Sequence, residues 1–116
     1  MGIFDPGFKK LVDEAPPQFT DFAAIALNQA DERIQRISLK GAATQDYFRT
    51  AVLAALVITA NQKLGIWSMK ASEAAKRRGD YALSQLRDDV IEEARDTVRF
   101  TWHTFGFLLI SEKPLT

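Results

Sequence analysis

AVLAALVITA at residues 51–60 and FTWHTFGFLLI at residues 100–110 are the two most apolar stretches of the chain, and they decide its fold. A helix that crosses a membrane needs about 20 predominantly apolar residues, and each stretch is about half that length. Arg49 precedes the first stretch, Arg99 precedes the second, and polar or charged residues follow both. We therefore expect both stretches to lie in a protein core. A membrane-associated accessory subunit remains an alternative that we do not favour.

Around these stretches, apolar residues recur at the three- and four-residue spacing of amphipathic helices. The pattern predicts helices over 20–40, 44–78 and 80–112. Apolar spacing continues past Gly65, so we predict one long second helix and keep a break at Gly65 as the alternative. The prolines among residues 1–19 do not allow a long helix there, and we expect these residues to form an N-terminal arm.

The end of the second helix has a strong stop signal in the sequence. Lys76, Arg77 and Arg78 suit the negative end of a helix dipole, and Gly79 suits the left-handed residue that commonly follows a helix. The sequence thus predicts a single all-α domain over 1–116, consisting of a long antiparallel helical hairpin, one shorter amphipathic helix and the N-terminal arm. A hairpin that turns at Gly79 would place residues 51–58 beside residues 100–107.

Residues 51–58 have no polar face, and a helix that is apolar on all sides must be buried on all sides. One short helix and a hairpin would leave part of this stretch in contact with water. We therefore expect a homo-oligomer or a multi-subunit assembly. The expected assembly interface comprises Phe48, Val52, Leu56, Trp102, Phe105 and Leu109, with Phe4 and Phe8 as contacts from the arm.

The far end of the predicted hairpin carries charges instead of apolar residues. Its residues are Lys76, Arg77, Arg78, Asp88 and Asp89. An alternative function is therefore a small inhibitor or regulator that docks this charged tip on a protein or nucleic-acid partner. Lys and Arg together number 15, as do Asp and Glu, and this neutrality makes nucleic-acid binding the weaker case.

Candidate catalytic residues are sparse. The chain has no cysteine and one histidine, His103, which lacks the second ligand or attachment motif expected of a haem site. The carboxylates Asp88, Asp89, Glu92 and Glu93 lack the histidine three residues on that a carboxylate-bridged metal site in a helical bundle uses, and we interpret them as a solvated face. No phosphate-binding loop or nucleophile motif is present. We expect no enzymatic activity, no metal and no cofactor.

The first ten residues lack the charged and apolar segments of a secretory signal peptide. We expect a protein of the cytoplasm or of an assembled particle. No specific motif resembles that of a known family. The leading hypothesis from the sequence is a non-enzymatic structural or adaptor subunit that self-associates through an apolar helical surface.

Overall fold

The computed structural model describes residues 10–11 and 14–110. Within this part the chain is helical and has no strand, which confirms the all-α prediction. The helices are α2 (Pro17–Arg36), α3 (Ala42–Leu64), α4 (Met69–Ser84), α5 (Asp88–Phe105) and the short α6 (Phe107–Ile110). Phe4 and Phe8, the expected arm contacts, lie outside the described residues.

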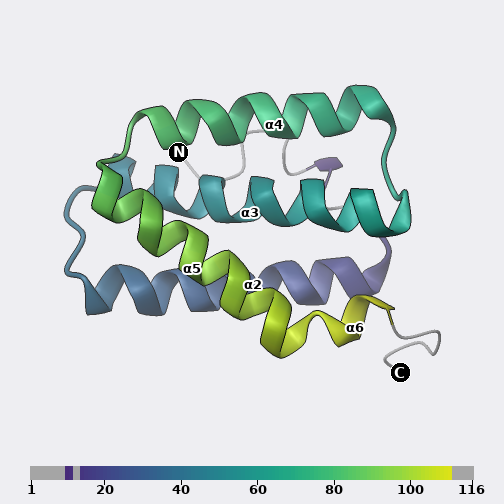
Figure 1. The fold of residues 1–116 in the computed structure, drawn as a ribbon, viewed down its shortest axis with the longest axis horizontal. Coiled ribbons are helices and arrows are strands. Elements are labelled where there is room, and N and C mark those ends of the chain that lie inside the picture. The colour runs from purple at the N-terminus through teal and green to yellow at the C-terminus, as the bar shows by residue number, and fades with distance from the viewer. Residues whose placement is uncertain (1–9, 12–13, 111–116) are drawn as a thin grey trace.

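Helix α3 is the centre of the fold. It packs against α2, α4 and α5, and Figure 1 shows α2 and α4 on opposite sides of it, with α5 crossing diagonally in front. Helix α2 begins at Pro17, three residues before the predicted start, because proline suits the first turn of a helix, where its missing N–H has no intrahelical partner to lose. It ends at Arg36, four residues before the predicted end.

The predicted continuous helix over 44–78 is wrong, and the alternative of a break at Gly65 is correct. Gly65 ends α3 in the left-handed conformation, with φ of 63°. The turn is held by side chains: Asn61 Oδ1 accepts the Trp67 backbone N–H at 2.5 Å, and Asn61 Nδ2 donates to Ser72 Oγ at 2.5 Å. Ser68 caps α4 by accepting the Ala71 N–H at 3.2 Å. The chain therefore reverses here, and α3 and α4 form the hairpin.

The predicted turn at Gly79 is also wrong. Gly79 lies in the interior of α4 and is buried, and a Cβ atom placed on it would lie 2.9 Å from the Cβ of Ala54. Glycine is used here for its lack of a side chain, which allows α3 and α4 to approach closely. The predicted helix over 80–112 is consequently divided among three helices: residues 80–84 end α4, α5 begins only at Asp88 and ends at Phe105, and α6 follows.

This change of topology weakens the physical argument for self-association. Because α4 folds back on α3 instead of extending it, the chain's own helices cover most of residues 51–58, and only Ala55 and Ile58 stay partly exposed. Val52, Leu56 and Val57 are 0% exposed and Leu53 is 1% exposed. The expectation that a lone chain leaves part of this stretch in contact with water therefore holds only at Ala55 and Ile58.

Aromatic side chains join the N-terminal helix to the rest of the core. Phe19 packs edge-on against Trp67 with ring centroids 4.9 Å apart, and Phe22 packs against Trp102 at 5.1 Å. The indole Nε1 of Trp67 donates to the carbonyl oxygen of Leu11 at 3.0 Å. These contacts fix α2 against both the α3–α4 turn and α5.

Candidate functional site

The surface between α4 and α5 is hollowed along one face of α3. Figure 1 shows α4 and α5 diverging from their connection at residues 85–87. Three hollows occupy this region, with volumes of about 270, 470 and 180 Å³, and we refer to them together as the trough. The first hollow is lined by Ala51, Ala55, Leu83, Ala94, Arg95, Val98 and Arg99. The second is lined by Lys63, Val98, Arg99, Trp102, His103, Gly106 and Phe107, and the third by Ile58, Asn61, Gln62, Met69, Ser72, Glu73 and Lys76.

Helix α3 forms the floor of the trough. Ala51, Ala55, Ile58 and Gln62 follow one another at three- and four-residue spacing, which places them along one side of the helix. They span eleven residue steps, or about 16 Å at 1.5 Å per residue. Because the side chains of Ala51 and Ala55 are short, the trough is deep at the end lined by Leu83, which we call the narrow end. Ala94 of α5 also lies there.

The walls of the trough are apolar near the floor. Leu83 stands on the α4 side and Val98 on the α5 side. The wide end carries two strongly exposed apolar side chains, Phe107 at 61% and Met69 at 78% exposed. Covering either of these large side chains would stabilise a complex with a partner, because it removes apolar surface from water.

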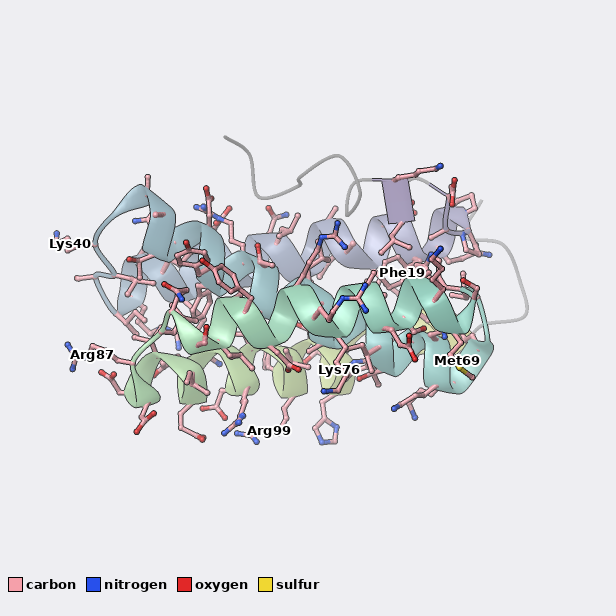
Figure 2. All side chains as sticks on the ribbon, turned by 90° about the horizontal axis from the view of Figure 1, so that it is seen from above. Phe19, Lys40, Met69, Lys76, Arg87 and Arg99 are labelled. Carbon is pink, nitrogen blue, oxygen red and sulfur yellow. The ribbon has the colours of Figure 1, made fainter. Side chains whose placement is uncertain are left out.

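The rims of the trough are mainly basic. Lys63, Lys76, Arg95 and Arg99 line the hollows, against one carboxylate, Glu73. Figure 2 shows that Lys76, on α4, and Arg99, on α5, point toward the same side of the molecule.

Three of these cations have partners on their own helices. Lys76 Nζ lies 3.0 Å from Asp80, Arg95 lies 3.1 Å from Glu92, and Arg99 pairs with Asp96. The hydrogen bond from Arg99 lowers the pKa of Asp96 below its usual range, while partial desolvation opposes this shift. All three pairs are well exposed, and water screens such pairs, so they contribute little to stability.

Trp102 forms part of the α5 wall. Lys63 Nζ lies 5.8 Å from the centre of its ring, in cation–π geometry. The indole Nε1 is buried and has no hydrogen-bond partner among the described residues. An aromatic side chain in this position is typical of the few residues that dominate a protein interface.

The predicted interface residues lie mostly elsewhere. Phe48, Val52 and Leu56 are core residues with no exposed surface, so they cannot contact a partner in this fold. Leu109 is 7% exposed. Trp102 and Phe105 are half-buried, and of the expected residues described here only Trp102 lines the trough.

The predicted charged tip is not a single surface. Lys76, Arg77 and Arg78 lie in the middle of α4, because Gly79 is not a turn. Asp88 and Asp89 occupy the first turn of α5, where the helix dipole favours carboxylates.

The carboxylates farther along α5 serve as structural partners. Glu93 pairs with Arg33 of α2 at 3.0 Å, and Glu92 pairs with Arg95. His103 is exposed on the α5 side of the second hollow. Residues 10–11 and 14–110 contain no group of three or more His, Cys, Asp or Glu side chains that could hold a metal ion.

Sequence reasoning missed most of the trough. Its one visible signal is the apolar stretch that contains Ala51 and Ala55, which the sequence indicates is too apolar for one chain to cover, but the sequence does not show which side chains stay exposed. Leu83, Ala94 and Val98 reach the trough because α4 folds back, and the predicted topology did not contain that fold.

No protein-family model, curated protein sequence or solved structure matches the chain significantly. In the part of the chain that the structure describes, no helix has the length and apolar character needed to cross a membrane. The trough is therefore the feature on which a functional argument has to rest.

Proposed function

We propose that the protein is a non-catalytic helical adaptor that binds another protein in the trough. The observation that carries this proposal is the face of α3 that the described residues leave open between α4 and α5, apolar at its floor and polar at its rims. This is the arrangement of protein interfaces, in which a polar rim surrounds an apolar centre. We place the adaptor in the cytoplasm or within an assembled particle, in line with the expectation from the sequence.

The shape of the trough favours a protein over a small molecule. Its hollows are open, and the first two adjoin, with Val98 and Arg99 as shared wall residues. Small-molecule sites, in contrast, enclose most of the ligand surface in one concave pocket. A long open groove is the form used to bind extended or helical segments of other proteins.

Self-association, the leading expectation from the sequence, takes second place in this proposal. It rested on an apolar stretch around Leu53 that the fold itself largely covers. A second copy remains one of the partners that the following experiment can identify.

Site-specific photo-crosslinking in the native host cells tests the proposal. A photoreactive benzoylphenylalanine replaces Arg95, which is exposed on the α5 rim, or Ala24, which is exposed on α2 outside the trough. We expect a discrete crosslinked protein from position 95 and none from position 24. Binding of that protein is then measured with purified components, and Ala55→Arg should abolish it while Ala24→Arg leaves it intact.

Two results contradict the proposal. Identical crosslinks from both positions would mean that the trough is not a preferred surface. A crosslink only to a second copy of the chain, with a concentration-dependent dimer in sedimentation, would assign the trough to self-assembly.

A further inference from the structure

We propose that the trough binds an acidic amphipathic helix of its protein partner. This inference rests on the proposed function and adds the chemistry of the partner segment. It follows from three properties of the trough: its length and depth, the position of its apolar side chains, and the sign of the charges along its rims.

The length and floor of the trough fit a helix of about three turns, since about 16 Å corresponds to about eleven residues. Packed helices lie about 8 to 10 Å apart, and the distance depends on the side chains at the contact. Ala51, Ala55 and Ala94 are the smallest side chains that a helix can present apart from glycine. They allow an incoming helix to approach α3 closely.

The apolar side chains of the trough define the face that the incoming helix must present. Leu83 and Val98 line the narrow end, while Trp102, Phe107 and Met69 line the wide end. A stripe of apolar residues at i, i+3, i+4 and i+7 would cover this line of contacts. The exposed Phe107 and Met69 would lose their contact with water at the same time.

The charges along the rims of the trough determine which charge the polar edges of the incoming helix should carry. Lys63, Arg95 and Arg99 on the α5 side, and Lys76 on the α4 side, would flank a helix lying on the floor. Glu73 is the single carboxylate among the lining residues. An acidic edge would therefore be attracted mainly on the α5 side, where three cations and no carboxylate line the first two hollows, whereas a basic edge would be repelled there.

The existing ion pairs do not cancel this preference. Asp80, Glu92 and Asp96 neutralise Lys76, Arg95 and Arg99 only through exposed pairs, which are weak. None of these three carboxylates lines the hollows. An acidic helix would approach the cations more closely than it approaches these carboxylates.

Two synthetic peptides test the inference on the full-length protein. Both have about 18 residues, since shorter isolated helices are only marginally stable, and both carry the same stripe of leucine and alanine. One has glutamate along both edges of the stripe, and the other has lysine. Binding is measured at low salt by the fluorescence anisotropy of labelled peptide. We expect the acidic peptide to bind at least about tenfold more tightly, with an affinity that falls as salt is added.

Matched variants locate the binding. Arg95→Glu combined with Arg99→Glu should weaken the acidic peptide by at least about tenfold, because it reverses the charge of one rim. Arg77→Glu reverses an exposed charge of the same helix pair outside the lining and should change little. Ala55→Arg, which fills the floor, should abolish binding, whereas Ala24→Arg should not. Circular dichroism and a denaturant midpoint show that each variant is folded.

The remaining outcomes separate this inference from the proposed function. Equal binding of both peptides, blocked by Ala55→Arg, would overturn the acidic preference and leave the trough as a protein site. Preference for the lysine peptide, binding of neither peptide, or acidic binding that Ala55→Arg does not affect would each overturn the inference. The crosslinking from Arg95 then decides the proposed function independently.

Discussion

Replacing Gly79 by alanine is the sharpest test of the packing of α4 on α3. In an uncrowded helix this change stabilises a protein by about 0.5 to 1 kcal/mol, because glycine is a poor helix former. At Gly79 the new Cβ would lie 2.9 Å from the Cβ of Ala54, closer than carbon atoms pack in proteins. Overpacking of this kind costs about 1 to 3 kcal/mol. We therefore expect Gly79→Ala to lower the free energy of unfolding by about 1 kcal/mol, and by at most about 2.5 kcal/mol.

The partner residue provides the decisive control. Ala54→Gly alone should destabilise the protein by about 1 to 2 kcal/mol, through lost helix propensity and one lost buried methyl group. In that background the space for a Cβ at position 79 is free, so Gly79→Ala should become stabilising by about 0.5 to 1 kcal/mol. The double-mutant cycle therefore predicts a coupling of about 1 to 3 kcal/mol between the two positions.

Urea unfolding followed by circular dichroism measures all four proteins, and Ala24→Gly on the exposed side of α2 calibrates the cost of glycine in this chain. If Gly79 were a turn residue, Gly79→Ala would also destabilise the protein. Ala54→Gly would then not restore the lost stability. Stabilisation by Gly79→Ala in the wild-type background would refute the close contact, and zero coupling would refute the α3–α4 register.

Other consequences of the structure are tested by single substitutions. Gly65→Ala should lower the free energy of unfolding by about 1 to 2 kcal/mol, because alanine is strained at a φ of 63°. No neighbouring atom crowds the site, so this backbone strain is the whole cost, and thermal unfolding measures it. The pKa of Asp96 is held below its ordinary value mainly by the hydrogen bond from Arg99, so its stabilising contribution is complete above the ordinary aspartate pKa and is lost as pH falls through the native pKa. In Arg99→Gln, an NMR titration should show this pKa rising toward the ordinary value, and an unchanged pKa would contradict the pairing. Thr101→Val should change stability by less than about 1 kcal/mol in chemical denaturation, because the buried hydroxyl donates only to the Thr97 carbonyl of its own helix, at 2.7 Å.

The helical segments could be predicted because their signals are local. Apolar residues at three- and four-residue spacing predicted helices in every region where the structure has one of appreciable length. In α2, Ala23, Ala26, Ala30 and Ile34 recur at this spacing and are buried. The burial of the stretch around Leu53 was also predicted, since a helix without a polar face has to be enclosed. What was wrong was the identity of the element that encloses it.

The sequence by itself determined the all-α class, the approximate helical segments and the need to bury residues 51–60. Only the tertiary structure decided where the chain reverses. Gly65 and Gly79 both follow a segment of helical pattern, and glycine has two uses that look identical in a sequence: it adopts left-handed conformations at little cost, and it lets two helices approach closely. Gly65 serves the first use and Gly79 the second, because a close partner for position 79 exists only once α4 has folded back on Ala54. The same reversal covers the apolar stretch and opens the trough between α4 and α5, so the candidate site depended on a long-range contact that no local pattern encodes.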